Sequence, residues 1–559
     1  MIARVLPDVA ALERVFDYLI PEPLRDQVRV GTIVRIDLHG RRVGGWVVEV
    51  TDAPATDRPL KPLAKVTGWG PAPELVELSS WAAWRWAGRR SAFLRAASPQ
   101  VAVRSLPSAT GSARALSTRS GSISAGDSRR ISTQNGGTGV TVVRVPPAAD
   151  VVPHVLDGLG DADGLVLASS VGAAARLARR LRDTGRRVAL MPRDWAMAAG
   201  GGCTVVGARA AAWAPVPALG AVVVVDEHDE AYQEERAPTW NARDVALERA
   251  RRADAPAVLL SPCPSLEALE AGELVTLRRA DEREGWPVLE IVDRRRDDPT
   301  RGLYSERLVQ LLRSERRVVC VLNRKGRARL LACAACGELA RCEHCGAVVA
   351  QLEATLVCRR CEQERPAVCA ACGSTRLKVL RPGVTRVQED LDRLAGRPVV
   401  VGTEAALHRE EAADAVAFLD FDQELLAPRY RAGEEAMALL ARAARLVGGR
   451  DRDGRLLVQT RVPRHEVLDA VVHADPGRLA VVESARRAAL RLPPEAAVAI
   501  VSGEAAERFV FAVEGVELLG PTDGRWMLRA PDHATLCHAL AAVPRPPGRL
   551  RVEVDPLRA

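Results

Sequence analysis

Eight of the twelve cysteines in this chain of 559 residues fall between positions 333 and 372 and form four Cys-x-x-Cys pairs. A Cys-x-x-Cys turn presents two thiolates to one tetrahedral metal ion, and two such turns complete a four-sulfur zinc site. The pattern therefore predicts two zinc ions. Because four sulfur ligands leave no open coordination position, both ions are expected to be structural rather than catalytic.

The gaps between the four pairs indicate how the pairs combine. The gaps are five, twelve and seven residues long, and the middle gap, 346–357, has apolar residues near both ends, as in a short β-ribbon. This favours a nested arrangement, with an outer centre (zinc 1) and an inner centre (zinc 2); the other two pairings stay open. The expected ligands are Cys333, Cys336, Cys369 and Cys372 for zinc 1, and Cys342, Cys345, Cys358 and Cys361 for zinc 2. The alternative is a disulfide cluster, which is disfavoured because nothing marks the chain as secreted.

Length and charge limit the class of protein. A chain this long is expected to fold as three or four domains. The net charge of +8 is consistent with a polyanionic partner, although the basic residues are nearly all arginine, a bias that we attribute to a G+C-rich genome. The first residues lack the layout of a signal peptide, and no apolar run is long enough to span a membrane. We therefore expect a cytoplasmic protein with no membrane partner.

The pattern along the chain predicts a multidomain α/β protein. Residues 30–50 alternate apolar and polar positions around glycines, which is typical of a hairpin in a small β-barrel, and 75–97 have the spacing of a helix. Ser, Thr, Gly and Ala dominate 105–139, which are expected to form a flexible linker. From residue 140 onward, short apolar strands alternate with helices, as in parallel sheets. The cysteine pairs interrupt the second α/β run, so they are predicted to form an insertion.

An apolar strand, 221–225, runs directly into Asp226-Glu227-His228-Asp229. A buried strand that ends in Asp-Glu is the Walker B arrangement of P-loop ATPases, in which the Asp holds Mg²⁺ and the Glu polarises water. The motif is weak evidence by itself, because acidic residues commonly end strands. It gains weight from its neighbours in the sequence, 206–209, 261–263 and 323–326.

Several motifs in order resemble the PriA family of primosomal replication-restart helicases. Matching segments are 14–21 near the start, the Walker B strand with Tyr232, Trp240 and 241–244 after it, 323–326 leading into the cysteine pairs, and 515–521, 524–526 and 554–556 near the end. The resemblance implies a small β-barrel-like N-terminal DNA-binding domain, two RecA-like helicase lobes of superfamily 2 type, the two-zinc insertion and an α+β C-terminal domain. The zinc pairing of the family is the nested one.

With this resemblance, the expected domains are as follows. They comprise a 3′-end DNA-binding domain at 1–104, the linker at 105–139, lobe 1 at 140–275, lobe 2 at 276–330 and 376–465, the zinc insertion at 331–375 and the C-terminal domain at 466–559. The winged-helix domain that the family carries between its first domain and its motor has no counterpart, because the linker is too short and too polar to contain one.

The parts of the motor that bind ATP are degenerate. A P-loop needs successive backbone N–H groups around the phosphates, and the matching stretch here contains Pro146 and Pro147, which have no N–H to donate. No lysine in the chain follows a glycine. The segments 261–263, 408–411 and 445–450 also depart from the family motifs. ATP binding is therefore not expected, no catalytic residue is predicted, and Asp226 and Glu227 are interpreted as a Walker B remnant. The chain resembles the actinobacterial branch of the family, whose members keep the architecture and lose the ATPase motifs.

The DNA-facing residues match the family better. The resemblance implies a pocket for the 3′-terminal nucleotide of a nascent strand, formed by Phe16 for stacking, Asp17 as an acceptor, Gly40 for close backbone approach and Lys61 near the phosphate. Each of the four also has an ordinary structural explanation, as a core, turn, hairpin or surface residue.

The predicted function is that of a DNA-replication restart factor in primosome assembly. It would bind forked DNA with a 3′ end and single-stranded DNA, and help to reload the replicative helicase without unwinding DNA itself. Expected partners are primosome proteins, the replicative helicase or its loader, and single-stranded-DNA-binding protein, at forks in the cytoplasmic nucleoid. One alternative is an active ATP-dependent 3′-to-5′ helicase with a cryptic nucleotide site. Another is a non-catalytic zinc-ribbon scaffold.

Overall fold

The computed structural model describes most of the chain. The described residues are 1–9, 12–56, 59–107, 139–296, 303–314, 316–323, 331–352, 354–358, 361–379 and 384–558. Most of the predicted linker, 108–138, and the motif residues 324–326 lie outside the described residues.

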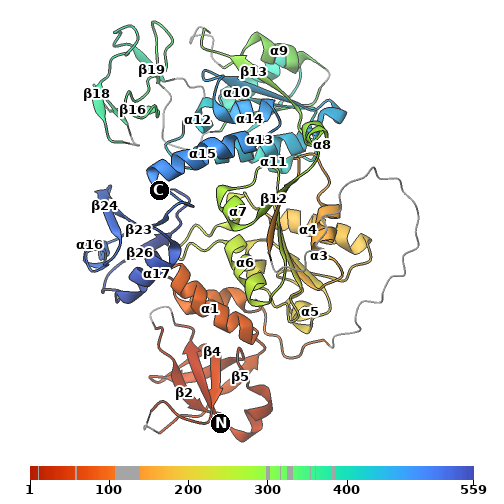
Figure 1. Ribbon diagram of the computed structural model, residues 1–559, viewed down its shortest axis with the longest axis vertical. Helices are drawn as coiled ribbons and strands as arrows, with labels where there is room; N and C mark the ends of the chain where they lie inside the picture. Colours follow the sequence, from red (N-terminus) through yellow and green to blue (C-terminus); the bar gives the residue numbers. More distant parts are fainter. Residues whose placement is uncertain are drawn as a thin grey trace.

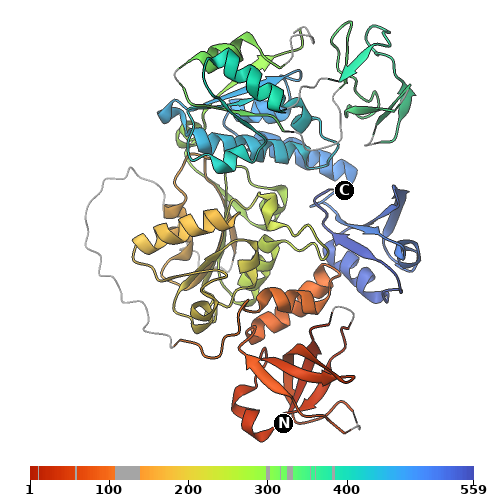
Figure 2. The same cartoon turned by 180° about the vertical axis from the view of Figure 1, so that it is seen from behind.

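Five units are arranged along the long axis of the molecule (Figures 1 and 2). The N-terminal sheet lies at one end and a parallel-sheet lobe with the cysteine-rich module beside it lies at the other, while the first parallel-sheet lobe occupies the middle. The C-terminal sheet flanks the middle lobe, next to helix α1 of the N-terminal unit. The multidomain α/β fold class predicted from the sequence is confirmed.

The N-terminal unit is a five-stranded antiparallel sheet in the order β2-β1-β4-β3-β5. Its strands are β1 (Ile2–Pro7), β2 (Phe16–Leu19), β3 (Ile33–Leu38), β4 (Arg41–Thr51) and β5 (Lys65–Gly68), with the 3₁₀ helix η1 (Glu22–Gln27) after β2. A parallel bridge from Leu19 to Pro62 joins the β2 edge to the segment that enters β5, which gives the sheet its barrel-like closure. The predicted hairpin turns at His39 and Gly40, both at positive φ (47° and 78°), as a tight two-residue turn requires.

The prediction of a single helix over 75–97 was wrong in one respect: the structure has two helices there. Helix α1 (Pro73–Arg85) and helix α2 (Arg90–Ala97) are separated by a turn that contains Ala87 (φ 43°) and Gly88. A Cβ on Gly88 would lie 2.6 Å from Cβ of Pro238. The break therefore makes room for a loop of the middle lobe, a long-range contact that helical periodicity cannot reveal.

The middle unit, lobe 1, is a seven-stranded parallel sheet in the order β12-β6-β11-β10-β7-β9-β8. Its strands are β6 (Val140–Arg144), β7 (Gly164–Leu167), β8 (Val188–Leu190), β9 (Thr204–Gly207), β10 (Ala221–Val225), β11 (Ala257–Ser261) and β12 (Glu273–Thr276). Its helices are α3 (Val152–Leu159), α4 (Val171–Asp183), α5 (Trp195–Gly200), η2 (Arg209–Trp213), η3 (Glu230–Tyr232), α6 (Ala242–Arg252) and α7 (Leu266–Ala271). The inner strands are apolar on both faces because helices cover both sides, whereas the edge strand β12 is largely exposed.

Lobe 2 is a five-stranded parallel sheet in the order β13-β22-β21-β14-β20. Helix α8 (Arg279–Glu284) connects it to lobe 1, and its strands are β13 (Val288–Asp293), β14 (Val318–Val321), β20 (Val400–Gly402), β21 (Ala415–Phe418) and β22 (Arg455–Thr460). Its helices are α9 (Glu306–Arg313), α10 (Val384–Ala395), α11 (Ala406–Arg409), α12 (Asp422–Leu425), α13 (Ala432–Val447) and η5 (Arg450–Arg452). Helices α14 (Glu466–Val472) and α15 (Gly477–Leu490) pack on α13 and share the core of lobe 2.

The cysteine-rich module leaves lobe 2 after β14 and returns before α10. It contains a two-stranded sheet, β15 (Leu331–Cys333) with β19 (Leu377–Val379), and a three-stranded sheet of β16 (Val349–Leu352), β17 (Thr355–Cys358) and β18 (Glu364–Pro366). The C-terminal sheet, in the order β24-β25-β23-β26, consists of β23 (Ala497–Ser502), β24 (Glu517–Thr522), β25 (Arg525–Ala530) and β26 (Arg551–Val554), with helices α16 (Ala506–Val510) and α17 (His533–Ala542).

Candidate metal centres and nucleic-acid interface

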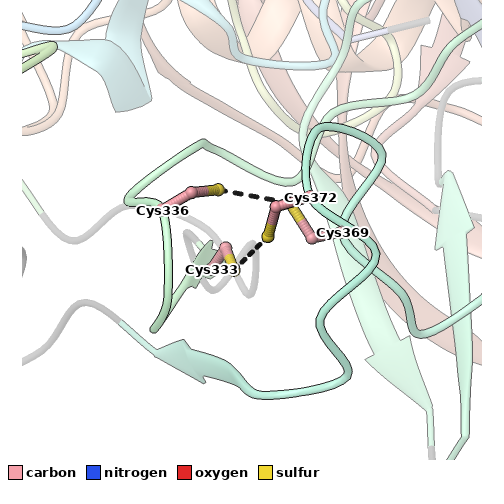
Figure 3. A group of neighbouring side chains, drawn as sticks. All are labelled: Cys333, Cys336, Cys369 and Cys372. Atoms are coloured by element: carbon pink, nitrogen blue, oxygen red, sulfur yellow. Dashed lines mark hydrogen bonds between the residues drawn. The ribbon is translucent and has the colours of Figure 1, made fainter.

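The eight clustered cysteines lie in two groups of four, and within each group all sulfur atoms are within 4.8 Å of one another. Cys333 and Cys336 meet Cys369 and Cys372, as Figure 3 shows, with Sγ–Sγ distances of 3.5 Å for Cys333–Cys372 and 3.6 Å for Cys336–Cys369. The second group joins Cys342 to Cys361 at 3.4 Å and Cys345 to Cys358 at 3.5 Å. The grouping is the nested one.

All four Cys-x-x-Cys turns have the same backbone hydrogen bonds. In each turn, the N–H four residues after the first cysteine donates to the carbonyl of that cysteine at 2.8–3.0 Å, as Gly337 does to Cys333. The N–H of the first cysteine in turn donates to the carbonyl five residues later at 2.8–2.9 Å, as Cys333 does to Glu338. The residue after each second cysteine has positive φ: it is glycine at Gly337, Gly346 and Gly373, and Glu362 in the remaining turn. The local sequence thus builds four equivalent turns, three of them with the residue that left-handed backbone favours.

The sulfur geometry fits a tetrahedral metal better than disulfides. A disulfide needs sulfur atoms about 2 Å apart, whereas four thiolates about 2.3 Å from one zinc ion lie roughly 3.8 Å from each other. Backbone N–H groups near the sulfur atoms favour thiolates: the N–H of Ala335 donates to Sγ of Cys333 at 3.3 Å. Either group of four therefore could hold one metal ion, and four-sulfur sites are characteristic of zinc.

The candidate nucleotide cleft lies at the carboxyl edge of the lobe 1 sheet. Because parallel strands share this edge, it brings together the residues that follow β6, β10 and β11. The segment after β6 is the one expected to match a P-loop. Its Ala148 N–H donates to the carbonyl of Gly285, just after α8, at 3.2 Å, and its prolines have no N–H to offer. A Cβ on Gly285 would lie 2.4 Å from Cβ of Pro146. The connection between the lobes therefore packs directly against the place of a phosphate cradle.

Asp226, the first residue of the Walker B remnant, is bound to an arginine. Its two carboxylate oxygens accept from Nη1 and Nη2 of Arg445 on α13, both at 2.6 Å, and Arg445 Nε lies 3.3 Å from the carbonyl oxygen of Pro147. Burial would raise the pKa of Asp226, but the charge and hydrogen bonds of Arg445 outweigh burial and lower it. Arg445, the first residue of the degenerate segment 445–450, thus occupies the acceptor that would otherwise hold a metal ion.

Glu227, the second residue of the remnant, is buried and hydrogen-bonded to other protein groups. Its fully buried carboxylate accepts from the N–H and Oγ of Ser265, both at 2.8 Å, and from Arg243 at 3.2 Å. Ser265 is the N-cap of α7, so Glu227 anchors the start of a helix. Nδ1 of His228 lies 2.8 Å from Oγ of Ser261 at the end of β11. Glu227 is engaged by protein groups on both oxygens.

The aromatic residues after the remnant are packed inside the protein. Tyr232 is fully buried and donates to the carbonyl of Val225 at 2.6 Å, and Trp240 lies edge-on against Trp213. The same loop holds the C-terminal unit: Thr239 Oγ1 donates to the carbonyl of Val554 at 2.8 Å. In this chain the loop therefore joins lobe 1 to the C-terminal sheet.

A buried charge cluster completes this junction and was not identified from the sequence. Asp555 accepts from Nη2 of Arg85 at 2.6 Å and lies 2.8 Å from Nε2 of His533. Arg85 lies at the end of α1, so the cluster joins the N-terminal unit to the C-terminal one. The segment 554–556 was noted as a family motif, but its partner lies 470 positions away, a separation that local patterns do not register.

Of the residues expected to bind a DNA 3′ end, Phe16 and Asp17 lie on β2, Lys61 lies on the segment bridged to β2, and Gly40 lies at the turn between β3 and β4. Phe16 and Asp17 are neighbours on β2, so their side chains point to opposite faces, and Phe16 packs partly against the core of this unit. Lys61 is exposed, and its carbonyl accepts from the N–H of Leu19 at 2.9 Å. Tyr18 Oη donates to the carbonyl of Asp37 at 3.1 Å, which brings β2 toward the turn that contains Gly40.

The Asp17 carboxylate is 6% exposed and already has partners. Oδ2 accepts from the N–H of Ala55 at 2.6 Å, and Oδ1 lies 3.6 Å from Nε of Arg4 on the adjoining strand. A ligand that uses Asp17 therefore has to compete with the loop that contains Ala55, whereas Lys61 and Gly40 are accessible without rearrangement.

Comparison with known proteins gives consistent matches for the N-terminal unit and for the chain as a whole. Residues 4–99 match the PriA family of 3′DNA-binding domains (3′BD). A replication restart protein PriA from Bacillus subtilis is 26% identical over 378 residues, which cover 57% of this chain and 47% of the relative. A probable replication restart protein PriA from Mycobacterium tuberculosis is 27% identical over 576 residues, covering 89% of this chain and 86% of the relative. The chain spans about half the length of the Bacillus relative and of one from Haemophilus influenzae, at 47% and 55%.

Solved structures resemble the chain only distantly. A DEAD box protein from Methanococcus jannaschii aligns with 60% of this chain and 85% of its own, at 10% identity and a TM-score of 0.28. Among the described residues, no helix combines the length and apolar character needed to cross a lipid bilayer.

Proposed function

We propose, from its similarity to the PriA family of replication restart proteins, that this chain binds forked DNA and helps to reload the replicative helicase without unwinding DNA itself. The observation that carries the proposal is the match of residues 4–99 to the PriA 3′ DNA-binding domain, together with the corner of that domain that contains Phe16, Asp17 and Lys61. In the proposed complex the terminal nucleotide lies in this corner.

We propose roles for Phe16, Asp17 and Lys61 in that corner, and for Gly40 at the turn between β3 and β4. Phe16 stacks on the terminal base, Asp17 accepts a hydrogen bond from the terminal hydroxyl or the base edge, Gly40 allows the strand to approach the backbone, and Lys61 neutralises a phosphate. Stacking by an aromatic side chain is typically worth about 1–3 kcal/mol per base, and a lysine near phosphate makes binding salt-dependent.

The proposed loss of motor activity rests on the nucleotide cleft. Prolines replace the phosphate cradle, Asp226 is bound by Arg445, and Glu227 caps a helix through Ser265. These contacts leave no prepared site for Mg²⁺ or for attacking water. We therefore propose that Asp226 and Glu227 have no catalytic role and that ATP is not a cofactor.

The two cysteine centres are proposed to hold one zinc ion each. When bound, each ion would cross-link two turns of a module that otherwise has little hydrophobic core, which is the usual role of four-sulfur zinc. The domain limits given above are proposed with the same premise, except that α14 and α15, which share the core of lobe 2, are assigned to that lobe. A cytoplasmic location at the nucleoid is also proposed. Proposed partners are single-stranded DNA, primosome proteins, the replicative helicase or its loader, and single-stranded-DNA-binding protein.

Equilibrium binding of the zinc-loaded protein to a fork tests the proposal. The leading strand would end at the junction in a free 3′-hydroxyl, at fixed salt because phosphate contacts dominate affinity. Asp17→Ala and Lys61→Ala are expected to weaken binding at least about tenfold, the size of one charge-assisted hydrogen bond. Asp26→Ala, an exposed aspartate on η1 in the same domain, is the matched control and should bind like the wild type.

Two outcomes separate the alternatives. If Asp17→Ala and Asp26→Ala bind the fork equally well, the pocket residues are structural and the scaffold alternative gains support. DNA-stimulated phosphate release that disappears in Asp226→Ala would instead favour an active helicase with a cryptic nucleotide site.

A further inference from the structure

The two lobes are joined by charge pairs on the side of the cleft where a nucleotide would bind. Besides the two 2.6 Å hydrogen bonds between Asp226 and Arg445, Arg442 donates to Asp229 at 2.8 Å. Arg442 and Arg445 are one turn apart on α13, and Asp226 and Asp229 follow β10. Two arginines on one face of α13 in lobe 2 therefore bind the loop that follows β10, the central strand of lobe 1.

A second set of pairs lies at α7 of lobe 1. Glu267 accepts from Arg431, at the start of α13, and lies 3.3 Å from Nη1 of Arg487 on α15. The N–H of Leu266 donates to Oε1 of Glu434 at 3.2 Å. Burial would raise the pKa of Glu267, but Arg431, Arg487 and Arg243 outweigh it and lower the pKa to about 2, so the carboxylate is ionised at neutral pH.

The connection between the lobes adds a third set. Arg144, the last residue of β6, donates to Glu282 of α8 at 2.6 and 2.9 Å and to Asp475 at 3.0 Å. Arg279 of α8 donates to the carbonyl of Ala474 at 2.6 Å. Together with the Ala148–Gly285 hydrogen bond, these contacts hold α8 against the segment after β6, where a P-loop would bind phosphate.

We propose that the contacts of Asp226, Asp229 and Glu267 with lobe 2 form a permanent latch that holds the lobes closed without nucleotide. In a two-lobe motor, closure depends on groups of both lobes that share the phosphates and the metal ion, and it is reversed when they leave. Here the carboxylates of the protein itself supply the negative charge that the arginines of lobe 2 bind. This negative charge is covalently part of lobe 1 and cannot be released.

The surroundings of the latch support this assignment. Arg442 and Arg431 are 25% and 21% exposed and their carboxylate partners 9% and 15%, so these pairs are partly shielded from water, where charge pairs are stronger than on an open surface. A cavity of about 510 Å³ adjoins these two pairs, and both carboxylates and arginines line it, among them Glu230, Glu435 and Arg429. With the latch formed, the two lobes act as one rigid support for the cysteine-rich module and the C-terminal unit.

Amide hydrogen exchange of the full-length, zinc-loaded protein without DNA tests the latch. The double variant Asp226→Asn/Glu267→Gln removes two charges with little change in shape, and Asn tolerates the positive φ of 56° at position 226. Residues 264–271 and the start of α13 are expected to exchange at least about tenfold faster than in the wild type, as expected when partly buried pairs are broken. The N-terminal sheet should be unaffected.

Glu248→Gln is the matched control. Glu248 accepts two hydrogen bonds from Arg251, both at 2.8 Å, but that pair lies within α6 of lobe 1. It should leave the exchange of residues 264–271 and of α13 unchanged. A double variant that exchanges like the wild type in these segments would overturn the latch.

A second measurement needs no variant. Millimolar Mg-ATP should leave the exchange of the wild-type protein unchanged throughout both lobes. Slower exchange around the cleft on adding Mg-ATP would overturn the proposal, because it would show that a nucleotide closes the lobes further. Since no DNA is present, failure here is distinct from failure of the proposed DNA binding.

Discussion

Asp555→Asn is expected to loosen the C-terminal unit from the rest of the protein. Asp555 is bound by Arg85, which is only 8% exposed, and by His533. Removing the negative charge leaves the Arg85 guanidinium buried without its counter-ion, and breaking a buried pair from one side typically costs about 3–5 kcal/mol. Asparagine keeps one acceptor oxygen and tolerates the φ of 51° at this position, so we expect the lower end, about 3 kcal/mol.

Amide exchange of α17 and β26 measures this effect better than a melting temperature, because a chain of several domains does not unfold in one step. About 3 kcal/mol corresponds to protection roughly a hundredfold lower in these two elements. The hydrogen bond from Thr239 Oγ1 to the carbonyl of Val554 remains in the variant. We therefore expect β26 to exchange faster without unfolding completely.

The pH dependence has a defined sign. Burial would raise the pKa of Asp555, but Arg85 and His533 outweigh it and lower the pKa below its value in the unfolded chain, near 4. Its contribution to stability is therefore complete above the unfolded pKa and is lost as the pH falls toward the folded one. The difference between wild type and variant should persist down to about pH 5 and shrink below about 4. Equal protection at pH 7, or a difference that grows as the pH falls below about 4, would refute this reasoning.

Three further predictions concern the metal centres and the cleft. The purified chain should contain two zinc ions by elemental analysis, and Cys369→Ser should lose one of them while the Cys342 centre keeps its ion; a full complement in the variant would contradict the assignment. Glu362→Gly should stabilise the inner centre by about 0.5–1 kcal/mol, because glycine adopts the positive φ of 59° without steric cost, and a chelator should then remove zinc more slowly rather than faster. Phosphate release in the presence of DNA should stay at the background rate in both the wild type and Asp226→Ala, whereas release that depends on Asp226 would revive the helicase alternative.

The sequence predicted the elements that local patterns encode. The run of apolar residues at 221–225 forms the central strand β10, and the twelve-residue gap between cysteine pairs forms the ribbon β16–β17, because both signals are short and periodic. The nested cysteine grouping was favoured by the length and apolar residues of the middle gap, although the other two pairings stayed open. The absence of a phosphate cradle could be inferred because proline lacks an N–H wherever it lies.

Long-range charge pairs could not be predicted in this way. Nothing in the sequence around Arg445 indicates that it binds Asp226, 219 positions earlier, or that Arg85 pairs with Asp555. The break between α1 and α2 had the same origin, since it depends on the approach of Pro238 to Gly88. Likewise, the motif match that selected Asp17 does not reveal that the Ala55 N–H already occupies one of its oxygens.

We propose that this chain retains recognition of a DNA 3′ end and lacks ATP-driven movement. The most direct test is equilibrium binding to a fork whose leading strand ends in a free 3′-hydroxyl or in a 3′-phosphate, with and without Mg-ATP, at one salt concentration. The account predicts clear preference for the free hydroxyl, with the same affinities in the presence of Mg-ATP. Equal binding to both ends, or affinities that change with Mg-ATP, would contradict it.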